Sequence, residues 1–107
     1  MKNEYGVRLD RNGYAESIVP GRGQCQYCGR LDRPLQRHEV FHGAYREKSK
    51  RFGCWIEICD VCHTNLHHKD AQIDREIKSW MQANAMAHYR WTVEQFIKEF
   101  GKNYEVS

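Results

Sequence analysis

Two pairs of cysteines place the strongest constraint on how this chain can fold. Cys25 and Cys28 form the first Cys-x-x-Cys pair, and Cys59 and Cys62 form the second. Each pair can offer two sulfurs from one tight turn, which Gly29 eases after the first pair, and zinc takes four thiolates in a tetrahedron. A site closed by four protein ligands is structural, so its binding energy becomes folding energy. The sequence therefore predicts one structural Zn²⁺ that joins the two pairs.

The number of cysteines indicates metal ligands rather than disulfides. The chain has 107 residues and five cysteines, an odd count that argues against a disulfide framework. A single domain of this length buries a modest fraction of its surface and often needs an additional staple. Cys54, the fifth cysteine, lies in a strand-like run, and we expect it to be a small buried apolar residue.

Strand-like runs predict a β-hairpin in the middle of the chain. These runs are residues 35–41 and 54–59, and the polar, basic segment between them is expected to be a loop or a short helix. Residues 1–24 alternate weakly around Asn12-Gly13, which is a strong hairpin signal, and they predict a small β ribbon or an extended arm.

Two helices are expected after the hairpin. Apolar residues recur at helical spacing over 63–90. Thr92 and Gln95 fit the capping box of a second helix, and Gly101 can end it. The predicted fold class is α+β in one domain, 1–107, with a β arm (1–24), a zinc-pinned core (25–69) and C-terminal helices (70–107).

No segment of the sequence predicts a membrane span. No apolar run approaches the roughly 20 residues that cross a bilayer. Residues 1–17 lack the apolar core of a signal peptide. We therefore expect no membrane association and a cytoplasmic location.

Three histidines are candidate ligands of a second metal ion. His63 and His67 are four residues apart, so both would lie on one face of a helix and could bind one ion together. His38 lies on the first strand-like run, and it approaches that helix if the cysteine pairs draw the base of the hairpin together. Three imidazoles leave coordination positions open, as catalytic sites require. The alternatives are a Cys3His zinc site that includes His63, or histidines that are simply exposed.

In the order of these residues the chain resembles the HNH endonuclease superfamily, and its later helices with residues 96–104 resemble a phage-associated branch of that superfamily. The resemblance covers about residues 25–69, with a Cys-x-x-Cys pair, a strand with His38, and Cys-x-x-Cys-His followed by His67. It implies a ββα-metal fold, in which a hairpin and a helix enclose one divalent ion beside a structural Zn²⁺. It also implies hydrolysis of DNA phosphodiester bonds with Mg²⁺, Mn²⁺ or another divalent ion, in a phage or its bacterial host cell. His38, His63 and His67 match the ligands of that ion.

Glu39 stands where many members of the superfamily have a second histidine, which activates the attacking water. Glutamate is a weaker base than histidine, but metal-activated water needs less help, so Glu39 is expected to act as the base or as a further ligand. In a regular strand Glu39 would point away while His38 and His42 shared a face, which makes His42 the alternative base. The superfamily's central asparagine, which braces the loop, is not evident, and Cys54 stands near its position.

Basic residues predict DNA as the partner. The segment between the strands carries four cations and one acid, and further basic residues follow on the expected helix. Clustered arginine and lysine neutralise phosphates and release counterions. Tyr45 and Phe52, near the ends of the segment, could pack on sugar or base. The expected contacts with nucleic acid are Arg46, Lys48, Lys50, Arg51 and Lys69.

A second hypothesis is a non-catalytic zinc-binding module on the same fold, which binds nucleic acid or a protein partner. Glu39 at the position of the base and the missing asparagine favour it. Trp80, Trp91 and Phe100 could form the partner surface of such a module, with core packing as the alternative role of all three.

Overall fold

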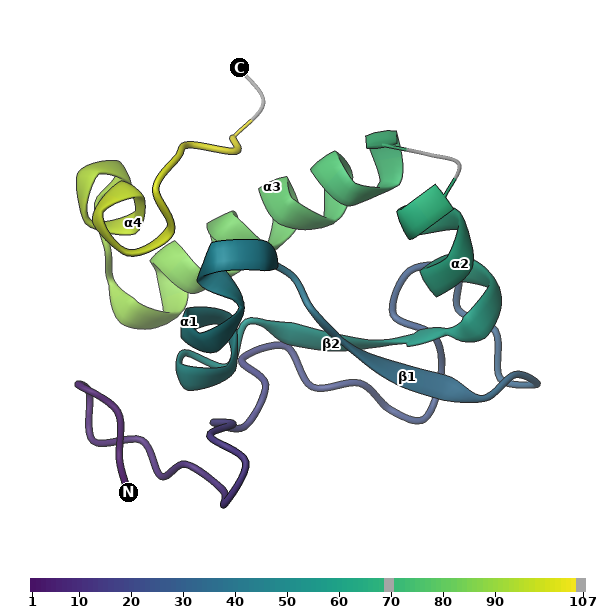
Figure 1. Ribbon diagram of the computed structural model, residues 1–107, viewed down its shortest axis with the longest axis horizontal. Coiled ribbons are helices and arrows are strands. Elements are labelled where there is room, and N and C mark those ends of the chain that lie inside the picture. Colours follow the sequence, from purple (N-terminus) through teal and green to yellow (C-terminus); the bar gives the residue numbers. More distant parts are fainter. Residues whose placement is uncertain (69–70, 106–107) are drawn as a thin grey trace.

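One antiparallel strand pair and the helices around it make up a small α+β fold (Figure 1). The computed structural model describes residues 1–68 and 71–105. The elements in this part of the chain are β1 (Leu35–Glu39), the short 3-10 helix η1 (Gly43–Tyr45), α1 (Arg46–Arg51), β2 (Trp55–Cys59), α2 (Asp60–His68), α3 (Ala71–Tyr89) and α4 (Val93–Phe100). None of these described helices combines the length and the apolar character that crossing a bilayer requires.

The predicted hairpin is confirmed. β1 and β2 pair antiparallel, with Leu35 opposite Cys59 and His38 opposite Ile56. Because successive side chains of a strand point to opposite faces, His38 and Glu39 lie on different faces of β1. The segment between the strands, expected to be a loop or a short helix, forms η1 and α1.

α2 begins inside the second cysteine pair. Cys59 ends β2, and Cys62 lies in the first turn of α2. Asp60 at the start of α2 is bound through both carboxylate oxygens to Arg33, at 2.9 and 2.5 Å. The first turn of α2 is therefore joined both to β2, which it follows directly, and to the segment before β1, which carries Arg33.

The helical spacing expected over 63–90 is present, and it is divided between α2 at the end of the core and α3, the first of the expected C-terminal helices. The apolar spacing continues from one to the other because Leu66 of α2 and Ile77 of α3 pack into the same core. Lys69 and Asp70, which stand between the two helices, lie outside the described residues.

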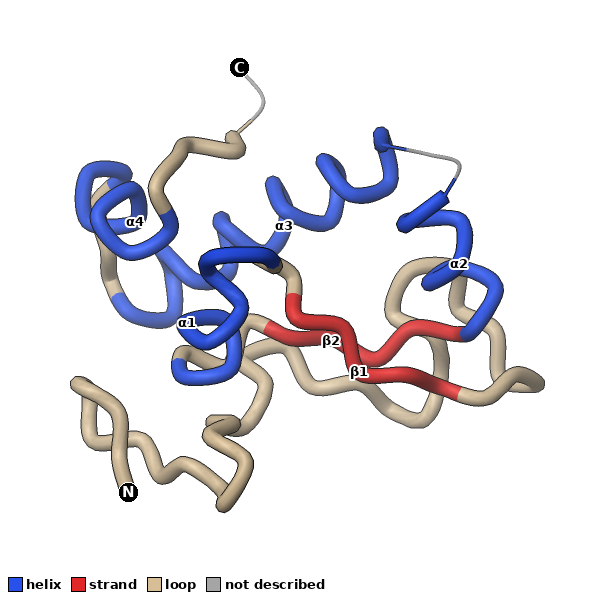
Figure 2. The backbone as a smooth tube through the Cα atoms, viewed as in Figure 1, coloured by secondary structure: helices blue, strands red, loops and turns tan. Residues whose placement is uncertain are grey.

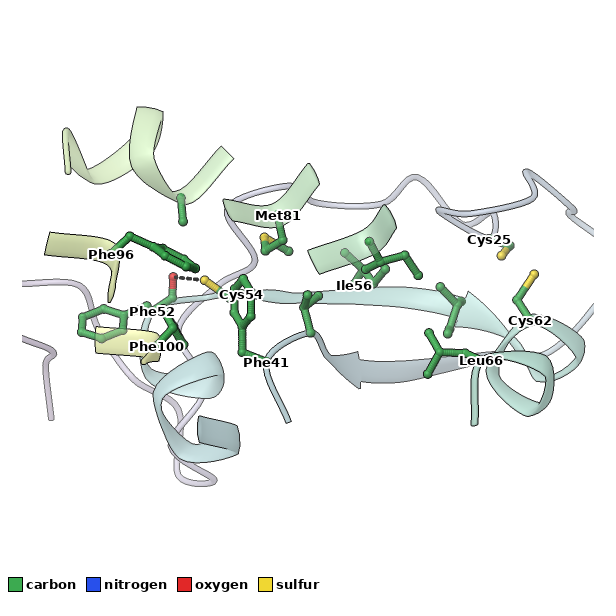
Figure 3. Close-up of a cluster of buried hydrophobic side chains, with 14 of the residues drawn as sticks. Cys25, Phe41, Phe52, Cys54, Ile56, Cys62, Leu66, Met81, Phe96 and Phe100 are labelled. Carbon is green, nitrogen blue, oxygen red and sulfur yellow. Dashed lines mark hydrogen bonds between the residues drawn. The ribbon is translucent and has the colours of Figure 1, made fainter. Parts of the chain in front are cut away.

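The core is a continuous apolar band along β2 (Figure 3). It runs from Cys25 and Cys62 at one end, past Ile56, to Phe96 and Phe100 of α4 at the other. The cysteine cluster and the C-terminal helices therefore stabilise one core.

The start and the end of α4 follow the signals in the sequence. The Thr92 hydroxyl accepts from Gln95 N–H at 3.2 Å, and Thr92 N–H donates to Gln95 Oε1 at 2.8 Å. The rings of Trp91 and Phe96 lie 6.4 Å apart, as in a hydrophobic staple. Gly101 ends the helix with φ of 80°. The capping box and the glycine stop are confirmed.

The N-terminal arm is extended, but the β ribbon predicted for it is wrong. Residues 1–24 contain no strand, only an isolated bridge between Lys2 and Arg8, and Figure 2 shows loop throughout. The predicted turn is present, since Gly13 N–H donates to the Asp10 carbonyl at 3.0 Å. Beyond this turn the arm forms hydrogen bonds to Lys50 at the end of α1 and to Trp55 of β2. Its bonding groups are therefore used on the hairpin and not on a second strand within the arm.

The end of the arm and the residues directly after it run along the outer edge of β2. Gln26 N–H donates to the Glu57 carbonyl at 2.9 Å, and Gln26 Oε1 accepts from Glu57 N–H at 2.8 Å. The Ser17 hydroxyl donates to the Trp55 carbonyl at 2.7 Å. These bonds pair the groups that a strand edge leaves free, and they support a two-stranded sheet that would be marginal alone.

Gly53→Ala tests how closely the arm packs against the hairpin. Gly53 has φ of +70°, and an added Cβ would lie 2.2 Å from the carbonyl oxygen of Glu16. Gly6 has φ of +78° with nothing within 4 Å of its Cβ position, so Gly6→Ala is a control for backbone strain alone. In urea unfolding we expect Gly53→Ala to cost about 3 kcal/mol or more and Gly6→Ala about 1 kcal/mol. Equal losses would contradict the close approach of the arm.

Candidate functional site

The two cysteine pairs meet at one point. The Sγ atoms of Cys25, Cys28, Cys59 and Cys62 all lie within 4.8 Å of one another, and those of Cys28 and Cys59 are 3.8 Å apart. Zinc–sulfur bonds of about 2.3 Å in a tetrahedron place two sulfurs roughly 3.8 Å apart. In each pair the N–H of the second cysteine donates to the first Sγ at 3.4 Å. The four cysteines could therefore hold a structural metal such as zinc.

The electrostatics of this cluster also fit a cation. Burial raises the pKa of Cys25, but hydrogen bonds from Cys28 and other nearby N–H groups outweigh burial and lower that pKa to about 6. Burial and the other three cysteines raise the pKa of Cys62. One thiolate thus opposes ionisation of the next, and a divalent ion removes this repulsion.

His38, His63 and His67 form a second cluster, whose ligand nitrogens also lie within 4.8 Å of one another. The Nε2 atoms of His63 and His67 are 3.1 Å apart. The ring centroid of His38 lies 5.7 Å from that of His63 and 5.9 Å from that of His67. Two imidazole nitrogens bound to one ion at about 2.1 Å stand roughly 3.0–3.4 Å apart. The structure thus brings the three predicted histidines together, and His63 belongs with them rather than with the cysteines.

His38 gives the physical reason to place a metal ion in this cluster. It is 3% exposed, and its Nε2 has no hydrogen-bond partner among the described residues. A buried polar atom without a partner costs about 1–3 kcal/mol. Burial, and after it the nearby His63, His42 and His67, lowers the pKa of His38 to about 4. The neutral ring therefore keeps a lone pair for a cation at pH 7, and the residues present fit a metal ion.

Gln36 sets the tautomer of His63. Its side-chain Oε1 lies 2.5 Å from His63 Nδ1. Because an amide oxygen only accepts, Nδ1 carries the proton and Nε2 is left with its lone pair facing His67. Metal-binding histidines commonly donate their second N–H to such a group. The sequence analysis did not select Gln36, although its place two residues before His38 puts both on one face of β1.

Glu39 is held away from the histidines. Its Oε1 accepts from the Tyr14 hydroxyl at 2.9 Å and from Arg46 Nε at 2.8 Å. Burial raises the pKa of Glu39, but these two hydrogen bonds, together with a backbone hydrogen bond and the charge of Arg46, outweigh burial and hold that pKa below its ordinary value. A carboxylate with a lowered pKa is a weaker base. The geometry therefore gives no support to Glu39 as the base or as a metal ligand.

His42 lies beside the histidine cluster and has a carboxylate partner. Its ring centroid is 6.0 Å from that of His38 and 6.3 Å from that of His67. Its Nε2 lies 3.1 Å from Oδ1 of Asp74, near the start of α3. Burial raises the pKa of Asp74, but hydrogen bonds from Lys78 and His42 outweigh burial and lower it. Asp74 is therefore charged at neutral pH, and no pattern in the sequence had connected it with His42.

Ser49 braces the loop that carries His42. Its buried hydroxyl donates to the Phe41 carbonyl at 2.7 Å and accepts from Phe41 N–H at 3.0 Å. Cys54 is fully buried, as expected of a small apolar residue, and its Sγ lies 3.9 Å from the carbonyl oxygen of Phe52 (Figure 3). The brace thus comes from a serine of α1 that nothing in the sequence singles out.

The basic residues expected to contact nucleic acid have acidic partners wherever the structure describes them. The ion pairs are Arg46 with Glu39 at 2.8 Å, Lys48 with Glu99 at 3.3 Å, Lys50 with Glu47 at 3.5 Å, and Arg51 with Glu4. Phe52 is buried in the core, so the expectation that it packs on a base is wrong. Lys69 lies outside the described residues. Contact of this segment with DNA stays a prediction.

Comparison with known proteins assigns no family to the chain. No protein-family model matches it, and neither a curated protein nor a solved structure does. The two clusters are therefore interpreted from their own geometry.

Cys25→Ser tests the cysteine cluster, with Cys54→Ala as the matched control. Loss of one of four ligands should remove the zinc ion held by the cysteine cluster and, with it, the cooperative thermal transition. Cys54→Ala removes a buried thiol outside the cluster, so it should keep the zinc and lower Tm by only a few degrees. Metal analysis and circular dichroism measure both effects. A Cys25→Ser protein with unchanged Tm would refute a structural metal here.

Proposed function

We propose that this chain is a metal-dependent endonuclease of the HNH type, which hydrolyses phosphodiester bonds of DNA. The observation that carries the proposal is the buried, unpartnered Nε2 of His38 beside the paired Nε2 atoms of His63 and His67. The order of β1, β2 and α2, with four cysteines at their junction, supports it. This is the order that the resemblance to HNH proteins implies for a ββα-metal core.

The three histidines would hold the divalent ion. Such an ion supplies Lewis acidity toward a phosphodiester oxygen and makes water a stronger acid. Imidazole ligands suit transition ions such as Zn²⁺, Ni²⁺ or Co²⁺, and Mn²⁺ is a weaker binder, whereas Mg²⁺ prefers oxygen. The donor set therefore favours a transition ion over Mg²⁺.

His42 is the better candidate for the base, and Asp74 would orient it. A carboxylate that accepts from one ring N–H leaves the other nitrogen free to take a proton. With Asp74 on Nε2, the nitrogen that accepts a proton from water is Nδ1 of His42. The His42 side chain is 42% exposed, so water and a phosphate group can reach it. Glu39 instead holds Arg46 and Tyr14 in place.

A second candidate function is a non-catalytic module that binds a protein partner. The observation in its favour is Trp80, which is 43% exposed, whereas Trp91 and Phe100 are buried. Trp80 lines a hollow of about 210 Å³ together with Tyr27 and Ile77. A large exposed aromatic beside a hollow is typical of binding surfaces.

Plasmid nicking by the His63→Ala variant tests the metal-binding histidines. We expect nicking with Mn²⁺, Co²⁺, Ni²⁺ or Zn²⁺ and a loss of about 100-fold or more in the variant, because one of three ligands is gone. His88→Ala is the matched control, since His88 is an exposed histidine of α3 outside both clusters. Both variants should keep their structural metal and their Tm. No nicking by the wild type with any of these ions, or equal activity of the two variants, would contradict the proposal.

A second set of variants identifies the base. His42→Asn should lower the single-turnover nicking rate by about 10²–10⁴-fold, the usual contribution of a general base. Asp74→Asn should lower it less, because the ring remains but loses its oriented tautomer. Glu39→Gln keeps acceptors for Tyr14 and Arg46 and should change the rate only a few-fold. The reverse order, with Glu39→Gln inactive and His42→Asn active, would assign the base to Glu39.

A further inference from the structure

Arg8, Arg11 and Arg37 line one hollow beside the N-terminal arm, and none of the three has an ion-pair partner within the described residues. All three are exposed. They differ in this from the cations of α1, each of which has an acidic partner. A cation that is not already held in an ion pair is the one that attracts a phosphate most strongly.

The arm lies between two hollows that share Arg8 and Arg11. The larger, of about 820 Å³, is lined by these two and by Arg37, Tyr14 and Trp55. The other, of about 500 Å³, also contains Lys48 and Arg51. The same two arginines can therefore reach a ligand in either hollow.

Arg37 is held in place by aromatic rings. Its Cζ lies 4.3 Å from the ring centroid of Tyr14 and 4.0 Å from that of Trp55. The two rings meet edge to face at 6.0 Å. A guanidinium stacked in this way loses little further freedom on binding, and its N–H groups at the rim stay available for phosphate oxygens.

The acids in the hollows do not cancel this charge. Asp10 and Glu16 line the larger hollow against three arginines, and Asp10 and Glu47 line the other against four cations. The Asp10 carboxylate already accepts from the N–H groups of Asn12 and Tyr14, at 2.8 and 3.0 Å. Glu47 pairs with Lys50 at 3.5 Å. Both hollows therefore keep an excess of positive charge.

We propose that this arginine surface, formed by Arg8, Arg11 and Arg37, binds the phosphate backbone of DNA apart from the histidine cluster. The choice of DNA rests on the proposed function. Arg37 directly precedes His38 on β1 and shares the face of Glu39, whose carboxylate accepts from the Tyr14 hydroxyl. DNA held here would extend the binding interface beyond the bond that is cut, without reading its sequence.

Binding of a short labelled DNA duplex to the zinc-loaded 107-residue chain tests this surface. Fluorescence anisotropy measures the binding at several salt concentrations, without further added metal. Arg8→Gln/Arg11→Gln should raise Kd on the order of tenfold at low salt and lower the salt slope by about 1 for each phosphate that the variant no longer neutralises. Arg8→Lys/Arg11→Lys keeps the charge and should keep most of the slope. Arg22→Gln/Lys98→Gln is the matched control, because it removes two other exposed cations without described ion pairs.

The outcomes separate this surface from the proposed catalysis. The arm variant should bind more weakly than the control variant at unchanged Tm. If the arm variant and the control variant lose DNA affinity equally, the effect is one of net charge and the proposed surface is overturned. It is also overturned if neither variant loses affinity. If the wild type nicks no plasmid but the arm variant still binds DNA selectively more weakly, catalysis is refuted and the surface stands. If the wild type nicks plasmid and the arm variant binds DNA as tightly as the wild type, the proposed surface is refuted and the proposed catalysis is not.

Discussion

The meeting of the two cysteine pairs is the constraint on which both clusters depend. Cys28 and Cys59 are 31 residues apart in the chain, yet their sulfurs lie 3.8 Å from each other. Closing a loop of this length costs chain entropy, which metal–thiolate bonds can offset when the sheet has only two strands. Since Cys59 ends β2 and Cys62 lies in the first turn of α2, the same closure directs α2 across the hairpin.

Strand register then decides which side chain faces α2. With Leu35 opposite Cys59, β1 presents Gln36 and His38 to the helix histidines, and it turns Glu39 toward Tyr14. A slip of one residue would exchange the two faces and bring Glu39 to the histidines. The cysteine cluster lies at the end of β2. A metal ion bound there would therefore also stabilise the strand register that places His38, rather than Glu39, beside α2.

The spacing of the cysteines and the helix-capping residues made the framework of the fold predictable from the sequence. The contacts between distant segments could not be predicted in this way. Cys-x-x-Cys pairs and the Thr92 capping box are local, so their geometry follows from neighbouring residues. His42 meets Asp74, which is 32 positions away, only because α3 begins where it does. Periodicity shows that a helix has an apolar face, but it does not show which polar residue of that helix meets a loop. For the same reason the apolar spacing did not separate α2 from α3, because residues of both helices pack into one core.

The ion pairs of α1 divide its cations into two kinds. Arg46 binds a Glu39 side chain that is only 10% exposed, so moving Arg46 to a phosphate would leave a largely buried carboxylate without its cation. Arg51 binds Glu4, which is half exposed, and water can replace either partner there. An anionic ligand would therefore recruit Arg51, which lines a hollow together with Arg8 and Arg11, far more readily than Arg46. A basic segment that looks uniform in sequence thus contains one residue that the fold requires and another that a ligand can take.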